Sequence, residues 1–209
     1  MTDRATWTPP LPLVSAEGRV KGTLGGSLLW DRPEHQAERE RVLSFLTPPG
    51  PVWLEIGFDH GMGILDRARR WPDRRQLGVE LRKRRVAGVA AHAPENCLLL
   101  ATDARGLLSR VLPSGRLDLT LILFPTPALD PRHLLLTEGL VAELARVTAP
   151  EGSVHLATDV PAYADWIRGL FSGWDEAEAP ELGPVLSRRE RVCRRDDLPV
   201  WRMTYRQSG

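Results

Sequence analysis

Short apolar segments alternate with amphipathic segments through the middle of the chain. Five apolar segments have the length of buried strands, and each is followed by a segment with helical periodicity. The predicted strands are Val52–Ile56, Gln76–Glu80, Cys97–Ala101, Leu117–Phe124 and Ser153–Ala157. The predicted helices are Met62–Arg70, Arg82–Ala93, Ala104–Leu112, Arg132–Val147 and Ala162–Leu170. This alternation predicts an α/β fold whose mostly parallel, doubly wound sheet is covered by helices on both faces.

The two ends of the chain follow other patterns. Residues 1–28 are rich in proline and glycine, which predicts an extended or mobile N-terminal arm before a single domain at 29–209. Pro33–Leu46 is predicted to be a helix, with the proline in its first turn. Val200–Arg206 alternates in polarity, and no helix fits between it and Val185–Cys193, so these two segments are predicted to form a closing antiparallel hairpin that completes a seven-stranded sheet.

Composition fits one ordinary globular domain. The 209 residues are 42% hydrophobic and 26% charged, and the formal net charge of +1 excludes a strongly basic protein but not a local basic patch. Cys97 and Cys193 lie far apart, which argues against a zinc site or a disulfide framework and fits a reducing cytoplasm. No apolar run reaches ~18 residues and no secretory pattern opens the chain, so we expect a cytoplasmic protein without a membrane span.

A glycine-bearing turn follows the first predicted strand. Glu55 lies near the end of that strand, and Gly57 and Gly61 precede the helix that begins at Met62. Glycine lets the backbone approach a ligand where a Cβ would collide, and many nucleotide-binding domains begin this way. Because glycine-rich turns also occur for geometric reasons alone, the interpretation depends on the other strand ends.

Acidic residues also mark the next two strand ends. Ligands of open α/β sheets bind at the carboxyl ends of the strands, so Glu80 is placed to accept both ribose hydroxyls of a nucleoside. Asp103 is placed to accept from an adenine amino group. Any one of these is ordinarily a solvated acid, but three in register favour a site. Glu55 and Asp59 would crowd a pyrophosphate and suit a cationic ligand, so the pattern favours S-adenosylmethionine over a dinucleotide.

At this point the chain resembles the bacterial tRNA (guanine-N7)-methyltransferases, which are class I S-adenosylmethionine-dependent enzymes. The resemblance runs from about Val52 to Arg206 and rests on several motifs that occur in the family's order. The motifs are Leu54-Glu55-Ile56-Gly57-Phe58, Leu77-Gly78-Val79-Glu80, Thr102-Asp103-Ala104, Phe124-Pro125-x-Pro127 with Arg132-His133, Leu156-Ala157-Thr158-Asp159 with Tyr163-Ala164, and Ser187-x-x-Glu190 before the Trp201 strand.

The resemblance implies roles for individual residues. The cofactor would be held by the residues of the first three motifs, together with the turn between the two prolines: Glu55, Gly57, Gly61, Glu80, Asp103 and Thr126. Asp159, Ser187 and Glu190 would hold the guanine, with Asp159 and Thr126 as the catalytic positions. Guanine N7 is an available lone pair, so methyl transfer would depend on placement and electrostatics rather than on a strong base. No metal is implied, and a monomer and a homodimer both stay open.

The chain departs from the family pattern in the segment after the fourth strand. Thr126 stands where the family has an Asp regarded as a cofactor and catalytic residue, and Ala128 replaces a Trp. Asp130 stands at the position of a substrate-binding Lys, and Leu134-Leu135-Leu136-Thr137 replaces a basic run. In the opening turn, Asp59 replaces a glycine. The Lys→Asp difference reverses a charge that would face phosphate, which weakens the expected grip on RNA there.

Three functional hypotheses follow. The first is an S-adenosylmethionine-dependent tRNA guanine-N7 methyltransferase with an altered loop; the second keeps the fold and cofactor but methylates a small molecule or another RNA. The third is an inactive binding paralogue, which the retained acids disfavour: Glu55, Glu80, Asp103, Asp159 and Glu190. Arginine clusters within 67–75, 82–85 and 188–195 are interpreted first as solvated faces and second as RNA contacts.

Overall fold

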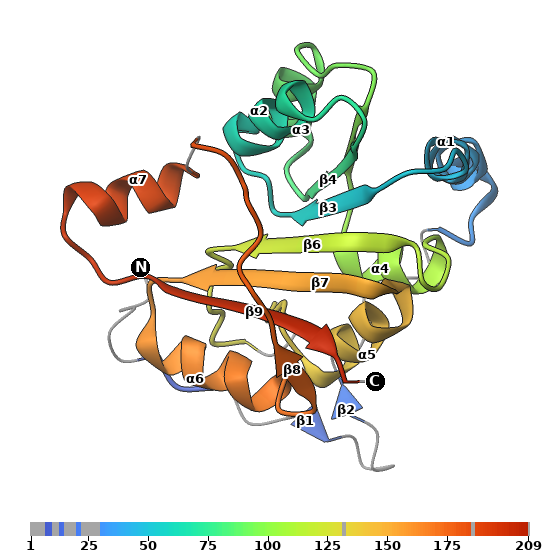
Figure 1. Ribbon diagram of the computed structural model, residues 1–209. Helices are drawn as coiled ribbons and strands as arrows, with labels where there is room; N and C mark the ends of the chain where they lie inside the picture. The colour runs from blue at the N-terminus through green and yellow to red at the C-terminus, as the bar shows by residue number, and fades with distance from the viewer. Residues whose placement is uncertain are drawn as a thin grey trace.

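A seven-stranded sheet forms the centre of the molecule (Figure 1). The computed structural model describes residues 7–9, 13–14, 20–21, 30–130, 133–184 and 187–208. The strands lie in the order β5-β4-β3-β6-β7-β9-β8 across the sheet. Their bounds are β3 Val52–Ile56, β4 Arg75–Glu80, β5 Cys97–Ala101, β6 Leu117–Leu123, β7 Thr148–Thr158, β8 Trp174–Glu176 and β9 Trp201–Gln207.

Strands β3 to β7 are parallel to one another, and the antiparallel pairs of this sheet both involve β9. β3 pairs in parallel with β4 and with β6, and its residues are buried throughout because both faces of the sheet are covered. β9 pairs antiparallel with both β7 and β8. The predicted fold class, a doubly wound mostly parallel sheet that closes with antiparallel strands, is therefore confirmed.

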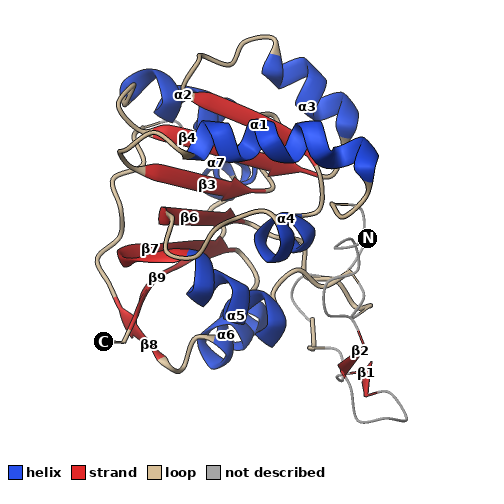
Figure 2. Ribbon diagram, turned by 90° about the vertical axis from the view of Figure 1, so that its right-hand side faces the viewer, coloured by secondary structure: helices blue, strands red, loops and turns tan. Residues whose placement is uncertain are grey.

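Helices cover both faces of the sheet (Figure 2). On one face, α1, α4, α5 and α6 pack with the strands into the main hydrophobic core. On the other face, α2 and α3 cover β4 and β5 through a smaller cluster that includes Ile64, Val86 and Val89. The helices span α1 Gln36–Leu46 after a 3₁₀ turn at Pro33–His35, α2 Met62–Arg70, α3 Lys83–Ala90, α4 Ala104–Arg110, α5 Glu138–Val147, α6 Pro161–Leu170 and α7 Arg188–Arg195.

The C-terminal part corrects one prediction. The predicted strand Val185–Cys193 is wrong, because residues 188–195 form helix α7 and residues 185–186 lie outside the described part. Ser187 caps this helix, since its Oγ accepts a hydrogen bond from the Glu190 amide at 3.1 Å. The antiparallel partner of β9 at the sheet edge is β8 instead. A Ser-x-x-Glu sequence is a helix-start signature, which outweighs the expected hairpin with the following strand here.

The helix predicted from residue 132 begins later. Arg132 itself lies outside the described residues, and α5 begins at Glu138, where Thr137 Oγ1 accepts from the Leu140 amide at 3.3 Å. Most of the predicted N-terminal arm is also outside the description, apart from 7–9 and two short strands, β1 Leu13–Val14 and β2 Val20–Lys21, which pair antiparallel. The boundary at residue 28 stays a prediction.

Candidate functional site

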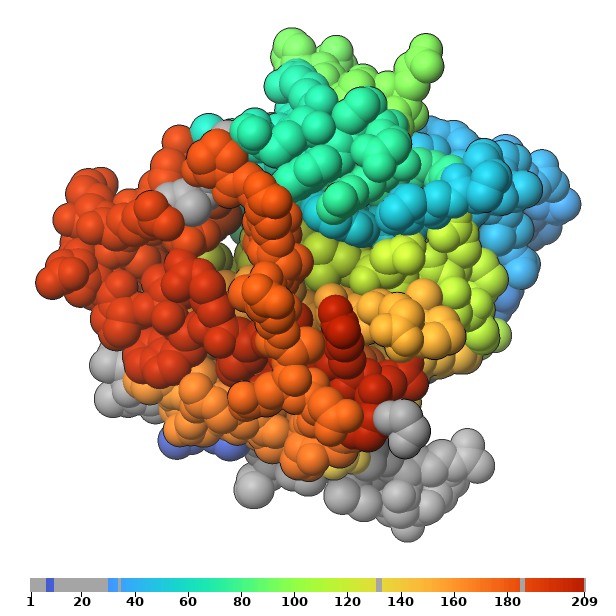
Figure 3. Space-filling model, viewed as in Figure 1, coloured from blue at the N-terminus to red at the C-terminus, as the bar shows by residue number. Residues whose placement is uncertain are grey.

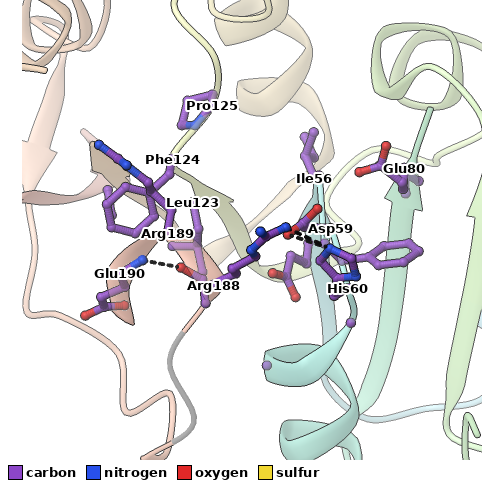
Figure 4. Close-up of a pocket in the computed structure, with 18 of the residues that line it drawn as sticks. Ile56, Asp59, His60, Glu80, Leu123, Phe124, Pro125, Arg188, Arg189 and Glu190 are labelled. Atoms are coloured by element: carbon purple, nitrogen blue, oxygen red, sulfur yellow. Dashed lines mark hydrogen bonds and ion pairs between the residues drawn. The ribbon is translucent and has the colours of Figure 1, made fainter. Parts of the chain in front are cut away.

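A cavity of about 830 Å³ opens at the carboxyl ends of the parallel strands. Its walls include the last residues of β3, β4 and β6, the turns that follow them, and residues of α7 (Figure 4). The segment between β8 and α7 passes in front of the sheet in the view of Figure 3. Pro180 and Leu182 of this segment also line the cavity. The size suits a cofactor-sized ligand, and the place is the usual ligand site of an open α/β sheet.

The glycine-bearing turn after β3 requires its glycines for two different reasons. Gly57 has φ +81° and would have open space around an added Cβ, so the backbone there can meet a ligand. Gly61 has φ +72°, and an added Cβ would lie 2.2 Å from Val89 Cγ1, so α3 packs directly on the turn. Asp59 has φ 50°, the left-handed region that suits glycine and that Asp tolerates better than most residues.

The acids at this end of the sheet are each paired with an arginine. Glu55 binds the buried guanidinium of Arg67, and Asp59 binds Arg85. The expected argument that Glu55 and Asp59 select a cationic ligand by charge therefore fails, because these arginines balance both carboxylates. The support for S-adenosylmethionine then comes from shape, position and family rather than from net negative charge.

Glu80 and Asp103 differ in how much of their carboxylates local contacts occupy. Glu80 is 9% exposed and lines the cavity; its Oε1 accepts from the Arg82 amide at 3.0 Å, and Oε2 lies 3.9 Å from Arg85. Asp103 caps α4 by accepting from the Arg105 amide at 2.9 Å. Both Asp103 oxygens also accept from the Arg105 guanidinium, Oδ2 at 2.6 Å. The Glu80 carboxylate therefore has more capacity left to accept hydrogen bonds from a ligand than the Asp103 carboxylate has.

The turn after β6 carries backbone strain at the cavity. Phe124 has φ 53°, unusual for an aromatic residue, and its amide donates to the Ala157 carbonyl at 2.7 Å. Thr126 is exposed and lines the cavity. Asp130 is not among the lining residues, although His133, whose Nε2 lies 3.9 Å from its carboxylate, is.

Helix α7 forms the facing wall. Ser187 and Glu190 line the cavity, and Glu190 pairs with Arg202 on β9. Asp159 is not a lining residue: its side chain is 3% exposed, and it accepts from Arg189 Nε at 2.9 Å. The structure thus brings the predicted site residues together around one cavity, except Asp130 and Asp159, and their individual roles stay predictions.

His155 is a lining residue that the sequence analysis missed. It lies on β7, is 3% exposed, and its Nδ1 is 2.8 Å from Thr204 Oγ1. Burial, with a smaller contribution from Arg202, lowers the pKa of His155 to about 4, so the imidazole is neutral at pH 7. His155 lies among mostly apolar residues near the carboxyl end of the predicted strand Ser153–Ala157, and this position is a signal that could have identified it as a site residue.

Arginine is the other residue type that the sequence analysis did not place at the cavity. Arginines from α2, the 82–85 segment, α4, α7 and β9 all line it: Arg67, Arg82, Arg85, Arg105, Arg188, Arg189, Arg194 and Arg202. No local pattern marks them, since they come together only through tertiary contacts. Within the described ranges, no group of His, Cys, Asp and Glu could hold a metal ion. No helix in that part of the chain is long and apolar enough to cross a membrane.

Comparison with known proteins gives family and fold. A family model described as "Putative methyltransferase" matches residues 49–197. The tRNA (guanine-N(7)-)-methyltransferase of Cereibacter sphaeroides is 35% identical over 199 residues, which is 85% of this chain and 78% of that protein. The enzyme of the same name from Nitrosococcus oceani is 36% identical over 126 residues, 57% of this chain and about half (53%) of that protein.

Solved structures with the same fold are methyltransferases. The crystal structure of the 16S rRNA methyltransferase KamB has a TM-score of 0.60 at 20% identity and covers 83% of this chain and 94% of that chain. A SAM-dependent methyltransferase from Aquifex aeolicus has a TM-score of 0.52 at 13% identity and covers 85% and 95%. At these identities, the similarity supports the fold alone.

Proposed function

We propose, because the chain belongs to the tRNA (guanine-N7)-methyltransferase family, that it transfers a methyl group from S-adenosylmethionine to N7 of a guanine in tRNA. The observation that carries this proposal is similarity over 85% of the chain, combined with a cavity at the strand ends where the family motifs meet. The cofactor would supply a methyl group activated by a sulfonium centre.

The residues at the ends of β3, β4 and β5 fit such a cofactor. Glu80 has carboxylate lone pairs to accept both ribose hydroxyls, and the open space beside Gly57 admits a ligand close to the backbone. Asp103 could accept from the adenine amino group if it shares its carboxylate with Arg105. Glu55 and Arg67 would then form the polar floor of the site.

On the acceptor side, the proposed task of the chain is to place guanine N7 and to exclude alternatives. N7 carries its own lone pair, so no strong base is needed and the neutral His155 is compatible with the reaction. Asp159 would accept from the guanine N1–H and amino group, which requires it to share or release Arg189. Ser187 and Glu190 would close the site from α7, and Thr126 would contribute a neutral hydroxyl.

A cytoplasmic enzyme acting on tRNA without a metal completes this proposal. The Cys97 thiol is buried and its pKa is raised to about 12, mainly by desolvation, so it is protonated and unreactive.

The second candidate function keeps fold and cofactor but changes the methyl acceptor. It is favoured by the segment after β6, where Asp130 replaces the family's Lys and Leu134 and Leu136 are core residues.

The deciding experiment incubates the full chain with methyl-labelled S-adenosylmethionine and total tRNA, then digests the RNA to nucleosides. We expect label in N7-methylguanine. Label absent from RNA but present in a small-molecule extract would replace the tRNA proposal with the second candidate. A parallel Thr126→Asp variant sharpens the result, because increased transfer would identify Thr126 as a weakening substitution, and unchanged transfer would show that the hydroxyl suffices.

A further inference from the structure

Two groups of exposed basic side chains lie on segments that line the cavity. The α3 group consists of Arg82, Lys83 and Arg84, at the start of α3, and the α7 group consists of Arg188 and Arg191. All five residues are exposed, and Arg82 and Arg188 also line the cavity. The groups are about a hundred residues apart in sequence and meet only because α7 folds back beside the β3 turn (Figure 1).

The positive charge of these groups is not balanced by nearby acids. Arg188 donates to His60 Nε2 at 3.3 Å (Figure 4). Arg191 donates to Met62 Sδ at 3.1 Å, so neither contact is with a carboxylate. Among the described residues, no acid lies within ion-pair distance of the α3 group. The deeper arginines differ, because acids pair with Arg67, Arg85, Arg189 and Arg202.

The contacts to His60 and Met62 also tie α7 to the turn after β3 and the start of α2. His60 lies in the turn after β3, and Met62 begins α2. The strand beside β3, β4, leads into the α3 group. The α7 group is therefore held beside the turn after β3. Exposed guanidinium groups suit phosphate oxygens, which accept bidentate, charge-assisted hydrogen bonds.

The segment after β6 carries less basic charge than the family pattern. Leu134 and Leu136, which replace the family's basic run, are 3% and 0% exposed and belong to the main core. Asp130 stands where the family has a Lys, and it is not among the residues that line the cavity. A polyanion would therefore find fewer basic partners in this segment than the family pattern provides, whereas α3 and α7 present exposed basic side chains among the described residues.

We propose that the α3 and α7 groups form a phosphate-binding rim that grips the RNA backbone on either side of the nucleotide whose base enters the cavity. This inference rests on the proposed function for the identity of the RNA. It relocates part of the electrostatic contact: the basic charge that the family pattern has at Asp130 and at Leu134-Leu135-Leu136 is supplied here by α7 and the start of α3. Such contacts position the substrate without reading sequence.

The test uses the full chain and four alanine substitutions, Lys83→Ala, Arg84→Ala, Arg188→Ala and Arg191→Ala, combined. The matched control is Arg39→Ala with Arg41→Ala, two exposed arginines on α1 at the far end of the sheet. Affinity for tRNA is measured by fluorescence anisotropy over a series of KCl concentrations, and affinity for S-adenosylmethionine by calorimetry.

We expect the combined variant to bind tRNA about tenfold or more weakly and to lower the slope of log K against log salt by about 2 to 4. Cofactor affinity should stay within about twofold in both variants. Arg188→Lys with Arg191→Lys should bind tRNA more tightly than the alanine variant and less tightly than the wild type, because lysine keeps the charge but cannot form the bidentate contact. An equal loss of tRNA affinity in the α1 control, or an unchanged salt slope in the combined variant, would contradict the proposed phosphate-binding rim.

The outcomes separate this inference from the proposed function. If the wild-type chain methylates tRNA and the combined variant keeps the same KM for tRNA, the rim is wrong and the function stands. If the wild-type chain binds tRNA with a rim-dependent salt slope but transfers no methyl to it, the function is wrong and the rim stands. If the combined variant fails to bind cofactor, the α7 pair alone, with its lysine counterpart, decides the question.

Discussion

The two sides of the cavity are built by contacts of different range. On the cofactor side, formed by the turns after β3, β4 and β5, Glu80 binds the amide of Arg82 and Asp103 binds Arg105, each two residues away. On the acceptor side, formed by the turn after β6, the end of β7 and α7, Asp159 binds Arg189 across 30 residues. Helix α7 also reaches His60 across 128 residues.

This difference indicates where the chain can change without losing its fold. Glu80 and Asp103 are held within their own strand–turn–helix units, which each sequence segment specifies locally, although Asp59 pairs with Arg85 across two such units. On the acceptor side, α7 is held by longer-range ion pairs, Asp159–Arg189 and Glu190–Arg202. Of the departures from the family, Thr126, Ala128 and Asp130 lie in the segment after β6, whereas Asp59 lies in the turn after β3.

The largest expected effect breaks the cofactor side at Gly61. Gly61→Ala should lower the free energy of unfolding by about 3 kcal/mol, because the new Cβ meets Val89 Cγ1 at 2.2 Å and φ is +72°. Gly57→Ala is the matched control, with positive φ but open space, and should cost about 1 kcal/mol. Urea denaturation measures both, and equal losses would mean that α3 does not pack tightly on the turn.

A second substitution tests whether the cofactor side binds the cofactor. Glu80→Ala should weaken S-adenosylmethionine binding by about 10- to 100-fold, the loss of a charge-assisted hydrogen bond to the ribose. Calorimetric titration measures this, with Glu151→Ala, an exposed acid near the amino end of the sheet, as the control. Unaltered affinity in the Glu80 variant would exclude its assignment to the ribose.

The smallest effect concerns the acceptor side. A double-mutant cycle with Asp159→Asn and Arg189→Gln should give a coupling energy of about 1–2 kcal/mol, because the Asp159 side chain is 3% exposed. The exposed pair Asp165–Arg168 on α6 should give about 0.3 kcal/mol. Unfolding free energies measure both cycles. Equal coupling in the two pairs would show that Asp159–Arg189 does not anchor α7.

The sequence predicted most of the fold because apolar periodicity is local. The bounds of β3, β5 and α2 agree with the predicted ranges, since each segment lies between strong turn signals. The prediction erred at α7, where a strand pairing with Val200–Arg206 is expected but Ser187 and Glu190 form a helix cap. Period alone could not separate the two structures in so short and so charged a segment.

The candidate site was predicted in part for the same reason. Residues at the strand ends, such as Glu55 and Glu80, follow from the position of each strand, so their convergence on one cavity could be expected. The partners of these acids could not, because an arginine's sequence position does not reveal which carboxylate it meets. The charge argument from Glu55 and Asp59 failed on this point.

By itself, the sequence determined the α/β architecture, the glycine-bearing turn and the family, because these depend on periodicity, backbone conformation and motif order. Only the tertiary structure decided the electrostatics of the cavity. It paired the acids with arginines, buried Leu134 and Leu136 in the core, and brought Arg188 beside His60 across the mouth. Charge acts through space and depends on distance and burial, and neither quantity is set until the chain has folded.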